Sequence, residues 1–237
     1  MFKKNALSPP LLKRFSIIVA AIFFAGIVIV YIFIGSSLFL IKDIEILNSD
    51  LIDEGSFSQL KNKNIFLARM DVLRDRVNEI PEIKNVVVKK ELPDKLIVEV
   101  NEYIPRALLK ENMKLAVSQE GTIFSFRGDE NESYPLLVYE KQNGKENLPL
   151  GQTFIGFERA IKTYLSIKDI VSVKIIKVKT ETEVFFLLEN AKTEIRMNSE
   201  EHAKESYYLS VLMEVLPYKN VEYIDFRFGE DIVVKPY

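Results

Sequence analysis

The sequence contains no cysteine, no tryptophan and a single histidine, His202. Without cysteine, the chain forms no disulfide bond, offers no thiolate nucleophile and cannot build a zinc site that needs sulfur ligands. One histidine also excludes the histidine-rich metal sites. Glycine and proline, at nine residues each, are too few for collagen-like or low-complexity structure. Most of the familiar catalytic and metal-binding sets are therefore excluded at the outset.

The sequence does contain enough apolar material for one or two folded domains, with 48% hydrophobic and 28% charged residues in a chain of 237. The net charge of −2 is unevenly distributed, because residues 1–14 carry four cations and no acid, which leaves about −6 for the rest. An acidic main body argues against nucleic acid as a partner.

The longest uncharged run extends from Phe15 to Ile34, and 14 of its 20 residues are Ile, Val or Phe. A helix of this length spans the ~30 Å hydrocarbon core of a bilayer. These side chains favour insertion by about 4 to 8 kcal/mol, and no charge within the run opposes it. We expect a transmembrane helix over residues 15–37, preceded by a cytoplasmic tail over residues 1–14.

Cations before this helix and a net acidic segment after it predict an N-terminus inside the cell and ~200 residues outside it. A cleaved signal peptide is the alternative, because the small residues Gly35, Ser36 and Ser37 follow the run. Its apolar region would be too long for a signal peptide, and no A-x-A pattern follows. We therefore expect a single-pass anchor in the cell (inner) membrane.

The region after the anchor has the pattern of a small α+β domain. We expect a strand over residues 39–47, helices over 53–61 and 70–80, and a hairpin of strands over 83–92 and 95–102. The second helix is amphipathic, with Met70, Leu73 and Val77 at spacings of three and four. This β-α-α-β-β order predicts two helices on one face of a three-stranded sheet.

Short strands and turns dominate from residue 107 onward. We expect strands over residues 114–118, 122–126, 136–139, 171–178, 184–188, 192–197, 221–228 and 232–235, and helices over 157–167 and from a cap at Asn198 or Ser199 to residue 216. The last two strands form a hairpin around Gly229.

Two segments carry a family resemblance. Leu92–Ala107 places a Leu-Pro-x-x-Leu turn before a strand and ends in Glu-x-x-Pro-x-Ala, and Val221–Phe228 is a late strand with an Asp-x-Arg pattern. Together with the anchor and Lys63-Asn64-Ile65-Phe66, they make the chain resemble the FtsQ/DivIB family of bacterial cell-division proteins. Tyr103 stands where that family commonly has arginine.

The resemblance implies a POTRA domain over residues 38–106 and a mostly antiparallel sheet domain with helices over residues 107–237. It also implies a scaffold of the divisome at the division septum. Such a scaffold recruits FtsB- and FtsL-like partners and helps to control septal peptidoglycan synthesis.

Patterns that resemble chemical motifs are incomplete. Ser58 and Lys61 have S-x-x-K spacing, but the S-D-N and K-T-G elements that accompany it are missing. The acidic loop at residues 129–132 lacks the glycine and the distal glutamate of a calcium-binding EF-hand. His202 has no second ligand residue at a suitable spacing, so we expect its side chain to be solvated or to cap the end of a helix. We expect no enzyme activity, cofactor, metal or small-molecule substrate.

A folded body displayed by one helix is typical of an interaction platform, and the expected means is strand addition to an exposed sheet edge. The resemblance implies the C-terminal sheet, with Arg227 and Phe228 at the matching positions and Phe228 in place of a frequent tyrosine. Ile232 and Val234 follow on the next strand, although Phe228 and Ile232 suit an ordinary core equally well. We expect charge reversal at Arg227, or proline at Val234, to abolish binding of an FtsB-like partner while leaving folding largely intact.

Two other classes of protein fit the sequence less well. A POTRA-bearing protein of transport or envelope assembly normally adds a long C-terminal β-barrel, for which we expect no room before Tyr237. An anchored cell-wall enzyme would need a set of polar catalytic residues that the sequence does not suggest. We also expect a fragment that starts near Lys42 to be soluble and monomeric.

Overall fold

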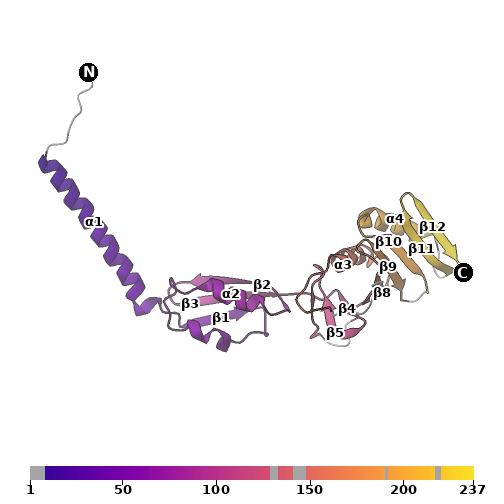
Figure 1. Ribbon diagram of the computed structural model, residues 1–237, viewed down its shortest axis with the longest axis horizontal. Helices are drawn as coiled ribbons and strands as arrows, with labels where there is room; N and C mark the ends of the chain where they lie inside the picture. Colours follow the sequence, from indigo (N-terminus) through magenta and orange to yellow (C-terminus); the bar gives the residue numbers. More distant parts are fainter. Residues whose placement is uncertain (1–8, 129–132, 141–147, 190–191, 217–219) are drawn as a thin grey trace, which may run out of the picture. The chain divides into compact units, whose positions relative to one another are not determined.

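The computed structural model describes residues 9–128, 133–140, 148–189, 192–216 and 220–237 (Figure 1). The first eight residues of the expected cytoplasmic tail and the acidic loop at 129–132 lie outside the described residues. The chain divides into two units: residues 1–77 with 85–101, and residues 78–84 with 102–237.

The N-terminal unit begins with α1 (Pro9–Gly35). Residues 14–35 of α1 form the one helix in the described chain that is long and apolar enough to cross a membrane. Its apolar side chains are exposed, as expected for a helix surrounded by lipid. The structure thus confirms a helix over the uncharged run and begins it earlier, at Pro9, because proline is tolerated in a first turn.

The rest of this unit is a three-stranded sheet with two helical segments. Its elements are η1 (Ser37–Phe39), β1 (Asp43–Leu47), η2 (Glu54–Leu60), α2 (Met70–Asn78), β2 (Ile83–Glu91) and β3 (Lys95–Glu102). The strand order is β1-β3-β2, and β1 pairs with β3 in parallel. The expected β-α-α-β-β order is confirmed. The first strand starts later than expected, at Asp43, because Phe39 belongs to η1 and Leu40 makes only an isolated bridge with Asn64. The first helix is a 3-10 helix.

The core of the POTRA-like unit follows from the sequence periodicity. Leu96, Val98 and Val100 alternate along β3 and are fully buried. The helical segments contribute buried residues from one face each, which are Phe57 and Leu60 from η2 and Leu73 and Val77 from α2. Figure 1 shows α2 lying across the sheet.

The C-terminal unit is a nine-stranded sheet with two helices. Its elements are β4 (Ala107–Leu109), β5 (Asn112–Val117), β6 (Ile123–Ser125), β7 (Leu136–Tyr139), α3 (Ile155–Ile167), β8 (Val173–Val178), β9 (Glu183–Leu188), β10 (Glu194–Asn198), α4 (His202–Val215), β11 (Val221–Phe228) and β12 (Asp231–Pro236). The strand order is β12-β11-β10-β9-β8-β7-β4-β5-β6. Five of the eight neighbouring pairs are antiparallel, and β10–β11, β7–β8 and β4–β7 are parallel.

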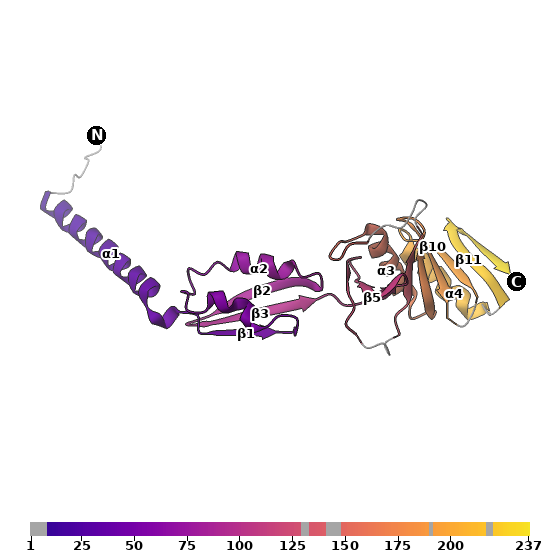
Figure 2. The same ribbon diagram turned by 60° about the horizontal axis from the view of Figure 1, so that its bottom comes forward.

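One face of this sheet is covered by the two helices. α3 packs against β8 and β9, and α4 packs against α3 and β10 (Figure 2). The residues beneath the helices alternate along the strands, with Val184 and Phe186 from β9 and Ile195 and Met197 from β10 fully buried. The α+β class and the sheet-rich second domain are therefore as expected from the sequence.

Two details of this unit differ from the expectation. β4 was not expected, because three residues are too few to show a period-two pattern. The last helix starts at His202 rather than just after Asn198 or Ser199, because Asn198 ends β10 and Ser199 is buried beside it. The Nδ1 of His202 lies 2.9 Å from the carbonyl oxygen of Ser199, so this side chain contacts the turn before the helix.

Candidate partner-binding edge of the C-terminal sheet

The C-terminal hairpin places β12 at one end of the nine-stranded sheet (Figure 1). β11 and β12 are antiparallel, with Ile224 opposite Val234 and Asp225 opposite Val233. The turn between them contains Gly229 at a φ of +76°, a left-handed conformation that glycine adopts without a steric penalty. This turn brings the chain back beside β11 and leaves the other side of β12 without a neighbouring strand among the described residues.

Apolar side chains are exposed along this hairpin. Phe228 is 58% exposed, Ile232 is 36% exposed and Val233 is 39% exposed. Val234 is half-buried and packs against the core beneath the helices. Isolated exposed apolar residues are common on protein surfaces, but these three lie on one edge hairpin, with Ile232 and Val233 on opposite faces of β12. They offer a partner segment apolar contacts on both sides of the edge strand. We call Phe228, Ile232, Val233 and Val234 the edge cluster.

The two ends of the sheet differ in their availability. β6 is three residues long, and its Ile123 and Phe124 are buried. β12 is six residues long, and five of its residues are exposed. A strand that adds to a sheet needs a run of accessible backbone donors and acceptors. Of these two ends, β12 therefore meets the requirement for strand addition.

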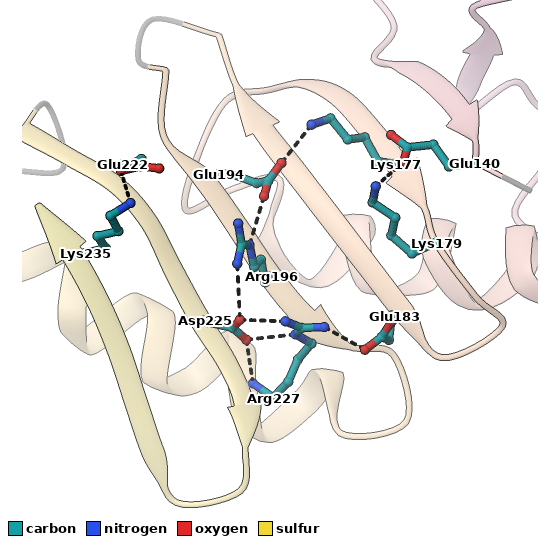
Figure 3. Close-up of polar contacts among 10 residues, drawn as sticks. All are labelled: Glu140, Lys177, Lys179, Glu183, Glu194, Arg196, Glu222, Asp225, Arg227 and Lys235. Atoms are coloured by element: carbon teal, nitrogen blue, oxygen red, sulfur yellow. Dashed lines mark hydrogen bonds and ion pairs between the residues drawn. The ribbon is translucent and has the colours of Figure 1, made fainter. Parts of the chain in front are cut away.

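Arg227 on β11 reaches across β10 to β9 (Figure 3). Its guanidinium donates to both carboxylate oxygens of Asp225, at 2.9 and 2.7 Å, and to Glu183 on β9 at 2.6 Å. It also lies over the ring of Phe185, 4.9 Å from the ring centre. A planar guanidinium suits this two-carboxylate contact better than an ammonium group does.

A second arginine lies on the same face of the sheet as Arg227, the face that the two helices do not cover. Arg196 on β10 lies 4.0 Å from the ring centre of Tyr223 and 3.8 Å from the carboxylate of Asp225. Its Nε donates to Glu194 at 2.9 Å, and Glu194 also accepts from Lys177 at 2.7 Å. The ion pairs therefore continue across β8, β10 and β11 (Figure 3). They fix the position of β11 and, through it, of β12.

The charges on this face are stabilised by their partners. Burial disfavours the charged form of Asp225, but the hydrogen bonds from Arg227 outweigh it and lower the pKa of Asp225 below its ordinary value. The hydrogen bond with Asp225 in turn raises the pKa of Arg227. The pKa of Glu194 is lowered in the same way, because Lys177 and Arg196 outweigh the cost of burial.

A buried carboxyl lies on the opposite side of the sheet. Glu205 of α4 is 3% exposed, and its carboxyl accepts a hydrogen bond from the backbone N–H of Asn198 at 2.8 Å. Burial raises the pKa of Glu205 to about 7, and this one hydrogen bond opposes the shift only in part. The nearby acids Glu201 and Asp225 raise it further.

The structure brings the four predicted site residues onto one hairpin, but their environments differ. Phe228 and Ile232 are exposed rather than ordinary core, Val234 is partly core, and Arg227 is engaged in ion pairs. Charge reversal at Arg227 would leave the buried carboxylate of Asp225 poorly paired. This variant should therefore lose stability, contrary to the expectation from the sequence that its folding stays largely intact.

Sequence reasoning missed several contributors to this site. Val233 was overlooked because a run of three apolar residues does not reveal which side chains are exposed. The Asp225-x-Arg227 spacing puts both side chains on one face of a strand and could have suggested their ion pair. Glu183 and Arg196 gave no such signal, because their contacts with Arg227 and Asp225 join distant parts of the chain.

Comparison with protein families matches both external parts of the chain. Residues 40–103 match the model described as POTRA domain, FtsQ-type, and residues 107–227 match the model described as cell division protein FtsQ/DivIB, C-terminal. The chain belongs to the FtsQ/DivIB family. No curated protein matches it. The match to residues 107–227 includes Arg227 but ends before β12.

Family membership gives the chain a role in cell division through the divisome. FtsQ/DivIB proteins are non-enzymatic scaffolds that act through protein–protein contacts. The apolar α1 and the family together fit a single-pass membrane protein. Among the described residues, no group of three or more His, Asp or Glu side chains could hold a metal ion.

Proposed function

We propose that this FtsQ/DivIB protein recruits FtsB- and FtsL-like partners to the division septum and thereby helps to control septal peptidoglycan synthesis. In this proposal the N-terminus is cytoplasmic and the two sheet-containing units lie outside the inner membrane. The excess of Lys and Arg before α1 supports this orientation.

The observation that carries the proposal is the exposed edge of β12. A partner segment that pairs with β12 in an extended conformation would satisfy the outward backbone groups of this strand. The edge cluster would give such a segment an apolar contact beside the backbone pairing. The ion pairs of Arg227 with Glu183 and of Arg196 with Asp225 join β11 to β9 and β10, so the edge is formed before the partner arrives and less ordering entropy is lost on binding.

The apolar contact can be tested with a double variant, Phe228→Asp with Ile232→Asp. Both side chains are exposed, so we expect the variant to unfold at nearly the wild-type temperature. We expect pull-down of an FtsB-like partner by the full-length protein to fall at least tenfold, a loss of ~1.4 kcal/mol or more.

The control is Met113→Asp, because Met113 on β5 is 59% exposed and so matches Phe228. This control should bind the partner as the wild type does. Wild-type pull-down by the double variant would show that the edge cluster is not the binding site.

The backbone contact can be tested with Val234→Pro. Proline removes an N–H group and restricts φ, so a partner strand cannot pair across this position in the usual way. Val234 is half-buried, and some loss of stability is expected as well. Thermal unfolding separates the two effects: lost binding by a protein that is folded at the assay temperature supports strand addition, and retained binding argues against it.

The cellular part of the proposal can be tested by location. A fluorescent fusion should gather at midcell in dividing cells, and a periplasm-dependent reporter enzyme fused after Tyr237 should be active. Uniform membrane fluorescence, or an inactive external reporter together with an active cytoplasmic one, would contradict the proposed place or orientation.

A further inference from the structure

The end of α1 is bound by the POTRA domain itself. The last four carbonyl groups of a helix lack partners within the helix. The side-chain amide of Asn64 donates to two of them, the carbonyl oxygens of Phe33 at 3.0 Å and Ile34 at 2.9 Å. Asn64 is buried, and its Oδ1 accepts from the N–H of Phe66 at 2.9 Å. One side chain thus joins the last turn of α1 to the loop over residues 64–67.

Backbone contacts hold the same junction. The N–H of Ile65 donates to the carbonyl of Phe39 at 2.8 Å, and the N–H of Ile41 donates to the carbonyl of Lys63 at 2.9 Å. Ile41 and Ile65 are both fully buried. The loop therefore belongs to the folded domain and is at the same time attached to the end of α1.

These contacts fix the depth of the loop relative to a bilayer. The uncharged part of α1 runs from just after Arg14 to Gly35, which at ~1.5 Å per residue is about the thickness of the hydrocarbon core. Phe33 and Ile34 therefore lie where the hydrocarbon meets the headgroups. Because Asn64 is bonded to both of their carbonyls, the loop must lie at this boundary too.

The loop exposes apolar side chains at this depth. Phe66 is 42% exposed and Leu67 is 60% exposed, and Leu38 beside the end of the helix is exposed as well. The rings of Phe33, Phe39 and Phe66 form one cluster, with ring centres 4.9 to 6.1 Å apart. The cluster continues the apolar surface of the span onto the domain. We call Leu38, Phe66 and Leu67 the junction patch.

The cations near the patch are compatible with a lipid surface. Lys61, Lys63 and Arg69 are exposed and lie within a few residues of the patch. Lys61 is paired with Glu54 at 3.4 Å and Arg69 with Asp71 at 2.9 Å, whereas Lys63 has no ion pair among the described residues. An exposed lysine beside apolar side chains is typical of segments that lie in the headgroup layer of anionic membranes.

We propose that the junction patch of the POTRA domain inserts into the headgroup layer of the bilayer that α1 spans. The occupant of the patch is phospholipid, because the patch is continuous with the lipid-facing surface of α1 and is held at its depth. The POTRA domain is then docked on the membrane rather than suspended from it by a free linker.

Insertion of the patch can be tested by tryptophan fluorescence. The chain has no tryptophan of its own, so the emission of each single tryptophan variant comes from the introduced residue alone. Full-length Phe66→Trp and Leu67→Trp are reconstituted into vesicles of zwitterionic and anionic phospholipid that carry bromine on the acyl chains close to the headgroups. We expect blue-shifted emission and strong quenching, close to that of Tyr31→Trp near the end of α1. Val87→Trp on β2 is the matched control, because Val87 is also 42% exposed and belongs to the same domain. It should be quenched by aqueous iodide instead.

Replacement of Phe66 changes the packing of the ring cluster, whereas Leu67 takes no part in that cluster. Leu67→Trp therefore reports on the patch without this packing change. The proposal is overturned if both patch variants behave as Val87→Trp does, which would be the result if the patch awaits a partner protein. Quenching by lipid that disappears as the protein-to-lipid ratio rises would indicate contact between copies of the chain and would also overturn it. Failure of Tyr31→Trp to be quenched would show that α1 is not inserted, and the proposal would fall with it.

Discussion

Arg227 binds a buried carboxylate, Asp225, and a more exposed one, Glu183, and the two contacts have different consequences. Asp225 depends on its partners, because an unpaired charge in a buried position is costly. Glu183 can be solvated if the contact is lost. The value of Arg227 to the fold therefore comes mainly from Asp225. Glu205 presents the opposite case at the residue scale, a buried carboxyl that accepts a hydrogen bond from a backbone N–H and has no ion pair among the described residues.

Replacement of Arg227 should lower the stability of the C-terminal unit. We expect Arg227→Glu to reduce the free energy of unfolding by about 2–4 kcal/mol, because Asp225 keeps only the longer contact with Arg196 and the hydrogen bond from the backbone N–H of residue 227. Arg227→Lys keeps the charge but loses the two-oxygen contact, so an intermediate loss is expected. Urea unfolding of the full-length protein in detergent measures both. Equal stability of Arg227→Glu and the wild type would contradict the role assigned to the ion pairs.

Glu205 should make stability depend on pH. Its carboxyl has an ordinary pKa of 4.5 and a pKa of about 7 in the fold. Below about pH 4.5 the carboxyl is protonated in both states, so it carries no penalty. As the pH rises towards 7 the unfolded state loses its proton first, and the folded state becomes less stable by up to ~3 kcal/mol.

The variant Glu205→Gln removes this titration. We expect it to be more stable than the wild type by about 1–3 kcal/mol near pH 8 and close to it near pH 4. Glu214→Gln is the control, because Glu214 is an exposed acid on the same helix. Thermal unfolding at several pH values gives the comparison. A difference between Glu205→Gln and the wild type that does not grow with pH would refute the assignment.

At the scale of elements, the junction between α1 and the POTRA domain and the hairpin of β11 and β12 are built differently. The hairpin depends on its turn at Gly229 and on ion pairs from β11 to β10 and β9. The junction depends on the amide of Asn64, on backbone hydrogen bonds and on the ring cluster of Phe33, Phe39 and Phe66. Of these contacts, the two hydrogen bonds from Asn64 to α1 can be removed by one side-chain change that leaves the rings in place.

The variant Asn64→Ala should loosen α1 from the POTRA domain. The lack of cysteine allows spin labels at two introduced cysteines, Tyr31→Cys and Val87→Cys. We expect the distance distribution between the labels to broaden in Asn64→Ala, because two hydrogen bonds to α1 are lost. Lys63→Ala is the control, since Lys63 is exposed. The same distribution in both variants would argue that Asn64 does not hold the junction.

At the scale of the whole molecule, the membrane helix and the folded units have separate requirements. α1 needs lipid around it, whereas the two sheets bury their own apolar residues. The external body should therefore be soluble and monomeric without α1. The point of separation matters, because Ile41 is fully buried and its N–H bonds to Lys63.

A fragment that starts at Ser36 should be more stable than one that starts at Lys42. The shorter fragment loses Ile41 from the core, which we expect to cost about 2–4 kcal/mol of unfolding free energy in the POTRA domain. Urea unfolding of the two fragments gives the difference, and sedimentation gives their oligomeric state. Equal stability would show that Ile41 is dispensable, and a large oligomer of either fragment would contradict separability.

Much of the fold could be predicted because local patterns were strong. The alternation of Leu96, Val98 and Val100 marked β3, and the spacing of Leu73 and Val77 marked α2. β4 was missed because a strand of three residues has no period to detect. The site was predicted in part: the family resemblance indicated Arg227 and Phe228, but not which of them is exposed.

The sequence by itself determined the membrane helix, because an uncharged run of 20 residues needs no tertiary context to favour lipid. Apart from β4, it also determined the order of strands and helices, because periodicity is a local property. Only the tertiary structure decided that β12 is an edge, that Arg227 pairs with Glu183, and that Asn64 caps α1. Each of these depends on which distant segments become neighbours, and the sum of many weak packing contacts determines that.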